Sequence, residues 1–194
     1  EEVVALHDLL ANPDCRLVTF VGPGGIGKSR LALRVAEEQI GLFAHGVVVV
    51  PLTTANSREL LVAALADALN ISGRVQNLEL QILDYLRDKS MLLVLDNFEQ
   101  LLSSVAVLDA LLQAAPGVVL LVTSRERLNL RQEWIYVVEG LRYPTEAKSE
   151  DLATHSALEL FKQRAVQVDP DFSLNAANLP WVMRRSEEHT SELQ

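Results

Sequence analysis

A glycine-rich stretch with a lysine and a serine has the residue types and spacing that bind a phosphate chain. The sequence GPGGIGKS, residues 22–29, lies between the apolar run RLVTFV and the segment RLALRVAEE. Glycine accepts backbone conformations that turn successive N–H groups toward phosphate oxygens in front of a helix. In such a loop the lysine contacts the β- and γ-phosphates, and the serine hydroxyl binds Mg²⁺. The residues expected to bind the nucleotide are Gly22, Pro23, Gly24, Gly25, Ile26, Gly27, Lys28, Ser29 and Arg30.

A second candidate residue ends another apolar run. In MLLVLDNFEQ, Asp96 follows residues typical of a buried strand. The carboxyl ends of parallel strands share one edge of a sheet, which is also the edge expected to carry the glycine-rich loop. We therefore predict that the Asp96 carboxylate holds Mg²⁺ together with Ser29.

The residues that follow Asp96 bear on whether the site cleaves what it binds. Fast ATPases with this kind of loop usually place a second acid directly next, to polarise the attacking water, and here that position is Asn97. Glu99 is the nearby substitute. The first turn of a helix also favours a carboxylate through the helix dipole, and this is the interpretation we prefer for Glu99. The pattern predicts binding more firmly than rapid hydrolysis.

A third motif, VVLLVTSRERL, brings polar side chains to the end of another apolar run. Arg125 follows Thr123 and Ser124 there, and an arginine near the γ-phosphate would distinguish a triphosphate from a diphosphate. The alternative is a mixed-charge surface at a strand end. The candidate catalytic residues are Lys28, Asp96, Glu99 and Arg125.

Composition excludes several other classes of site. The formal net charge of −9 argues against direct nucleic-acid contact by this piece of chain. Its single cysteine, Cys15, excludes an internal disulfide and a multi-cysteine metal site. No apolar run approaches the roughly 18 residues that a membrane span requires, so we expect no membrane contact and a cytoplasmic location. The isolated histidines and the aromatic pair near residue 135 are expected to be surface or packing residues, namely His7, His45, His155, Trp134 and Tyr136.

Short β-rich runs alternate with longer segments of helical period, which predicts an α/β fold with a parallel sheet covered on both faces. The expected strands are residues 17–21, 47–52, 91–95, 118–123 and 135–138. Helices are expected over residues 28–39 and around residues 78–86. Another helix should begin at a capping box formed by Asn56 and Glu59, and a fourth should run from Phe98 until Pro116 and Gly117 end it.

Beyond Gly140 the character of the sequence changes. We predict a nucleotide-binding domain over residues 1–140, and a linker with the start of a truncated helical lid over 141–184. The last ten residues, RSEEHTSELQ, match the translation of a common sequencing-adapter read-through, and we expect residues 185–194 to be a disordered artefact.

The three motifs in this order, followed by WIYVVEGL and ALELFKQRA, resemble the STAND class of P-loop ATPases. The nearest resemblance is to the NB-ARC-like ATPase module of bacterial AfsR- and LuxR-type multidomain transcriptional regulators. It implies a P-loop NTPase three-layer sandwich, with a mainly parallel five-stranded sheet, the loop-bearing strand central and a helical lid. It also implies a Mg²⁺-dependent switch that binds ATP or ADP, hydrolyses ATP slowly, self-associates with ATP and acts on other domains of its parent chain.

Two alternatives to the switch stay open. One is an ATPase of continuous turnover, such as an AAA+-like remodelling motor, which would need an acid beside Asp96. The other is an incomplete fragment that binds nucleotide weakly, because the turn expected before Glu1 and the GLPL segment expected after residue 184 would complete the adenine pocket. A GTPase is not favoured, because the sequence has no N-K-x-D motif.

Overall fold

A five-stranded parallel sheet forms the centre of the computed structural model, which describes residues 2–72, 77–139, 165 and 173. The strands lie in the order β2-β3-β4-β1-β5, and every neighbouring pair is parallel. Their bounds are Leu17–Val21 for β1, Val47–Pro51 for β2, Met91–Asp96 for β3, Val118–Ser124 for β4 and Glu133–Val137 for β5. This confirms the predicted α/β class and the five strands. The loop-bearing strand β1 is an interior strand, but β4 holds the middle position that was expected for it.

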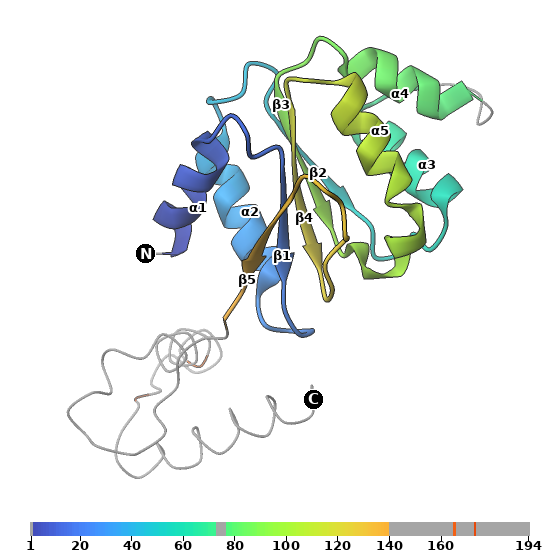
Figure 1. The fold of residues 1–194 in the computed structure, drawn as a ribbon. Helices are drawn as coiled ribbons and strands as arrows, with labels where there is room; N and C mark the ends of the chain where they lie inside the picture. The colour runs from blue at the N-terminus through green and yellow to red at the C-terminus, as the bar shows by residue number, and fades with distance from the viewer. Residues whose placement is uncertain (1, 73–76, 140–164, 166–172, 174–194) are drawn as a thin grey trace. The chain divides into compact units, whose positions relative to one another are not determined.

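Helices cover both faces of this sheet (Figure 1). Figure 1 shows α1 and α2 on one side, and α3, α4 and α5 on the other. The helices are α1 (Glu2–Ala11), α2 (Lys28–Gln39), α3 (Arg58–Ala68), α4 (Leu78–Leu86), the 3₁₀ helix η2 (Phe98–Ser104) and α5 (Ala106–Ala114). This arrangement is the three-layer sandwich that the sequence predicts.

The interior strands are mostly apolar because both of their faces are covered. In β3 the run from Met91 to Leu95 is buried at every position, and Phe98, two residues after the strand, has no exposed surface. The edge strand β5 differs, with Trp134 40% and Val137 64% exposed. Tyr136 packs inward, and its ring centroid lies 5.5 Å from that of Phe20 on β1.

Helix α3 begins one residue later than the sequence pattern predicts. Its N-cap is Ser57, whose hydroxyl accepts a hydrogen bond of 3.3 Å from the backbone N–H of Leu60, so the predicted capping box of Asn56 with Glu59 is wrong. The buried residues of this helix are Leu61, Val62, Leu65 and Ala66, whereas Leu60 is 46% exposed.

The single helix predicted from Phe98 is divided in two. Asn97 has a left-handed backbone with φ of 73°, and the turns that follow it form η2 before α5 begins at Ala106. The end of α5 is held by Arg16, whose guanidinium donates hydrogen bonds to the carbonyls of Leu112, Ala115 and Val118. The contacts with Leu112 and Ala115 satisfy carbonyl groups that a helix end would otherwise leave without partners, and the contact with Val118 joins Arg16 to the start of β4.

Residues 2–22 and 27–138 belong to one compact unit, and the segment 23–26 is described separately from it. The predicted linker, lid and tail lie almost entirely outside the described residues, so the domain boundary at 140 stays a prediction. Over the described ranges, none of the helices has both the length and the apolar character needed to cross a membrane.

Candidate functional site

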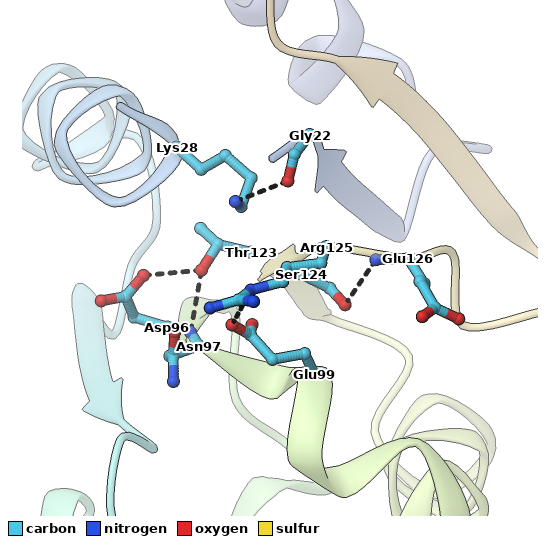
Figure 2. A network of polar contacts seen from close by, with 9 residues as sticks. All are labelled: Gly22, Lys28, Asp96, Asn97, Glu99, Thr123, Ser124, Arg125 and Glu126. Atoms are coloured by element: carbon cyan, nitrogen blue, oxygen red, sulfur yellow. Dashed lines mark hydrogen bonds and ion pairs between the residues drawn. The ribbon is translucent and has the colours of Figure 1, made fainter. Parts of the chain in front are cut away.

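Three neighbouring strands bring the predicted site residues to one edge of the sheet. Strand β4 lies between β1 and β3, so the ends of all three strands are adjacent. Gly22 follows β1, Asp96 ends β3 and Arg125 follows β4. Figure 2 shows these residues with Lys28 of α2 around a common region at the carboxyl ends of the strands. The structure thus places together residues that the sequence separates widely.

Lys28, the first residue of α2, turns its ammonium group back toward the end of β1. Its Nζ donates a hydrogen bond of 2.8 Å to the carbonyl oxygen of Gly22, and the side chain is buried. Burial has the largest effect on the pKa of Lys28 and lowers it. The carboxylate of Glu99 raises this pKa, the guanidinium of Arg125 lowers it by less, and the carboxylate of Asp96 raises it by the smallest amount. A buried cation therefore lies among two carboxylates and a guanidinium.

The glycine-rich loop has the backbone that its composition predicts. Gly25 and Gly27 have φ of 76° and 102°, a region that residues with a side chain rarely adopt. Gly27 is the N-cap of α2, and as a glycine it offers no side chain to cap the helix. A Cβ placed on it would meet no atom within 4 Å. The left-handed backbone, and not a lack of space for a side chain, is therefore what favours glycine at the start of α2, where the N–H groups of the first turn could meet an anion.

A short chain of hydrogen bonds fixes Asp96. The hydroxyl of Thr123 donates to Oδ1 of Asp96 at 2.6 Å and accepts from the backbone N–H of Asn97 at 2.8 Å. Thr123 is buried, so this hydroxyl is a fixed link between β3 and β4. The sequence interpretation missed this role for Thr123, although its position at the end of the strand next to β3 was a usable signal.

Arg125 forms an ion pair with Glu99, which the sequence interpretation did not foresee. The Nε atom of Arg125 lies 3.1 Å from Oε1 of Glu99, and the side chains are 64% and 17% exposed, respectively. Oε2 of Glu99 is buried and has no hydrogen-bond partner among the described residues. Glu99 does lie in the first turn of η2, where the helix dipole favours a carboxylate, but its side chain also faces the candidate site.

The available donors suit a magnesium ion that is shared with phosphate groups. Ser29 and Arg30 are exposed on the first turn of α2, so the Ser29 hydroxyl is accessible. Hydroxyl and carboxylate oxygens such as those of Ser29 and Asp96 are ligands that Mg²⁺ prefers, and Mg²⁺ commonly takes its remaining ligands from water and phosphate. Among the described residues no group of three or more His, Cys, Asp or Glu side chains could hold a metal by itself.

Two solved structures have a similar fold. Cdc6p from Pyrobaculum aerophilum matches with a TM-score of 0.53 and 18% identity, over 71% of this chain and 44% of that one. The ORC2 protein of Aeropyrum pernix, solved as ADPNP and ADP complexes, matches with a TM-score of 0.51 and 14% identity, over 89% of this chain and 53% of that one. At these identities the likeness shows the fold, an α/β P-loop NTPase.

Sequence relatives come from mycobacteria. "Uncharacterized protein Rv0894" of Mycobacterium tuberculosis is 34% identical over 165 residues, which are 84% of this chain and 39% of the relative. "Putative HTH-type transcriptional regulator Rv0890c" of the same organism is 33% identical over 175 residues, 88% of this chain and 18% of the relative. The chain thus spans well under half of the length of either relative. The NB-ARC domain family matches residues 1–169, and the chain belongs to that family.

Proposed function

We propose that this chain is an ATP- and ADP-binding switch module, with slow Mg²⁺-dependent hydrolysis, of a larger protein that regulates transcription. The observation that carries the proposal is the meeting of Lys28, Asp96 and Arg125 at the carboxyl ends of β1, β3 and β4. Lys28 and the N–H groups of the loop and of the first turn of α2 would hold the phosphates. Ser29 and Asp96 would hold the metal ion, whose chemistry is to neutralise phosphate charge.

The surroundings of Asp96 support slow hydrolysis. The position after Asp96 is Asn97, whose backbone N–H is held by Thr123, so no carboxylate stands beside Asp96 to polarise water. Glu99, three residues further along the chain, is the other acid of the site; its Oε1 accepts a hydrogen bond from Arg125 and its Oε2 is buried. Continuous turnover, as in a remodelling motor, would need a base that is free to accept a proton.

The relatives support the regulatory context. One of them carries the name of an HTH-type transcriptional regulator, and this chain corresponds to only 18% of its length. We infer that other domains of the parent chain contact DNA and respond to the nucleotide, and that ATP favours self-association. The Aeropyrum pernix structure, with its ADPNP and ADP complexes, supports adenine nucleotides as the ligands.

Equilibrium binding of ATP, ADP and GTP tests the proposal. The full chain is titrated in Mg²⁺, beside Lys28→Ala and the control Lys89→Ala. Lys89 is a partly exposed lysine just before β3, at the opposite edge of the sheet from the site, and its Nζ lies over the ring of Tyr85. We expect adenine-selective binding that Lys28→Ala abolishes and Lys89→Ala preserves. Equal binding of GTP, or binding that survives Lys28→Ala, would contradict the proposal.

Steady-state hydrolysis separates the switch from the motor. A switch should turn over well below the roughly 1–10³ per second that is typical of enzymes. Phosphate release by the full chain at saturating ATP, with Lys28→Ala as the blank, gives this number. A turnover number within the typical range would favour continuous turnover instead.

A further inference from the structure

We propose that Glu99 is a positioning residue, which holds Arg125 so that its two terminal nitrogens meet the terminal phosphate of a nucleoside triphosphate. The Glu99–Arg125 pair would then set the preference for a triphosphate over a diphosphate. This inference rests on the proposed nucleotide binding, and it assigns a separate task within the same site.

Glu99 is fixed firmly enough to act as an anchor. It lies in the first turn of η2 between Phe98, which has no exposed surface, and Leu101, which is also fully buried two residues further on. Its side chain is only 17% exposed. The carboxylate therefore belongs to a packed element, whereas its partner arginine comes from the exposed segment after β4.

Arg125 needs such an anchor because most of its side chain is in solvent. With 64% of the side chain exposed, it would otherwise sample many rotamers, and ordering it on a ligand would cost entropy. The ion pair with Glu99 lowers that cost before any ligand arrives. The same principle of preorganisation strengthens binding wherever a group is held in its bound geometry beforehand.

The contact leaves the phosphate-binding part of the guanidinium unused. Arg125 meets Glu99 through Nε alone, and the terminal nitrogens make no hydrogen bond or ion pair with the described residues. A guanidinium can bind a phosphate through its two terminal nitrogens while Nε keeps another partner. A phosphate therefore does not have to displace Glu99.

The rest of the site supports this placement of the pair. Among the neighbouring charges, the Glu99 carboxylate has the largest influence on the pKa of Lys28, ahead of Arg125 and Asp96. Lys28 is the lysine expected to contact the β- and γ-phosphates. The ion pair thus lies within electrostatic reach of the place where the terminal phosphate is expected.

A double-mutant cycle tests the proposal by equilibrium binding. Dissociation constants for ATP and ADP, with Mg²⁺, are measured for the full chain, Glu99→Ala, Arg125→Ala and the double variant. Removal of the Glu99 charge also removes the repulsion between this charge and a bound phosphate. The repulsion is lost both with arginine and with alanine at position 125, so the effect cancels in the cycle. In a matched control cycle Arg127→Ala replaces Arg125→Ala, because Arg127 is an exposed arginine two residues away.

We expect Glu99→Ala to weaken ATP binding about tenfold more when Arg125 is present than when it is alanine, which corresponds to about 1.4 kcal/mol of coupling. For ADP, and in the Arg127 cycle, the coupling should be near zero. Glu99→Gln keeps an acceptor for Nε and should retain part of the ATP-specific coupling, which a merely structural defect would not do.

Two outcomes would overturn the proposal. Coupling of the opposite sign would mean that Glu99 competes with the phosphate for Arg125. Absence of coupling with ATP in variants that still bind nucleotide through Lys28 would mean that the pair has no part in discrimination. Failure of the proposed function is a different result, because binding would then be missing from the unaltered chain or would survive Lys28→Ala.

Discussion

The hydroxyl of Thr123 lies 2.6 Å from Oδ1 of Asp96 and 2.8 Å from the backbone nitrogen of Asn97, so one buried oxygen joins the ends of β4 and β3. Hydroxyl groups donate one hydrogen bond and accept others, and this one does both. The arrangement fixes the orientation of the carboxylate proposed to hold Mg²⁺ and fixes the backbone of the residue that follows it.

Replacement of Thr123 by valine keeps the shape of the side chain and removes its hydroxyl. We expect the free energy of unfolding to fall by about 1–3 kcal/mol, because the N–H of Asn97 and Oδ1 of Asp96 lose their partner at a part-buried place. Urea denaturation measures this. Thr123→Ser keeps the hydroxyl and should lose less. Equal losses for the two variants would show that the missing methyl group, or altered packing, matters and the hydrogen bonds do not.

Alanine at Gly27 tests the backbone of the loop that we propose to bind phosphate. Gly27 and Gly41 have φ of 102° and 95°, and a Cβ at either would meet no atom within 4 Å, so the two positions differ little except in location. Strain of a side chain in the left-handed region should lower the free energy of unfolding by about 1–2 kcal/mol in both Gly27→Ala and Gly41→Ala. Only Gly27→Ala should weaken nucleotide binding.

Thermal or urea unfolding and nucleotide titration of the two glycine variants give the comparison. The same fall in stability with different binding would locate the nucleotide at the start of α2. If both variants bound nucleotide equally well, Gly27 would have no part in phosphate recognition.

Cys15 should be unreactive in the folded protein. It is 1% exposed, and burial raises the pKa of its thiol to about 11. A thiol-specific reagent at pH 8 should label the native chain slowly and the urea-unfolded chain at once. Because the sequence has one cysteine, the signal belongs to this residue alone. Rapid labelling without denaturant would show that β1 and the loop before it open readily.

The same thiol gives a dependence of stability on pH. The folded state keeps its proton up to a pKa of about 11, whereas the unfolded chain releases it near the ordinary value of about 8.5. Between these two pKa values the thiol holds its proton in the folded state more than in the unfolded state. The contribution of Cys15 to the free energy of unfolding therefore falls as the pH rises. Urea midpoints at pH 7.5 and pH 10 should therefore differ less for Cys15→Ala than for the unaltered chain.

Much of the fold could be predicted because interior strands and the glycine-rich loop have strong local signals. Four of the five strands begin at the predicted residue, and α2 has the predicted bounds, since buried strands are continuously apolar and a loop of this kind must precede a helix. The start of α3 was missed by one residue because Asn56 and Ser57 are both good N-caps, and only tertiary packing decides between them.

The contacts within the site were less predictable than its members. Lys28, Asp96 and Arg125 could be chosen from motifs, because each follows or begins an element whose end lies at one edge of the sheet. The pairing of Arg125 with Glu99 depends on how η2 leaves β3 after the left-handed Asn97, and no residue pattern in the sequence specifies that turn. The bond from Thr123 to Asp96 likewise depends on strand order.

The position of β1 between β4 and β5 has a consequence for the synthesis of the protein. Leu17 pairs with Leu120 on one side and with Glu133 on the other, so β1 emerges from the ribosome long before either of its strand partners. Helix α2 and its loop are likewise made before Asp96, at the end of β3, and Arg125, which follows β4. A nascent chain can therefore acquire the complete edge that we propose to bind phosphate only after Arg125 has been made, and stable nucleotide capture would report that β1 has paired with β4.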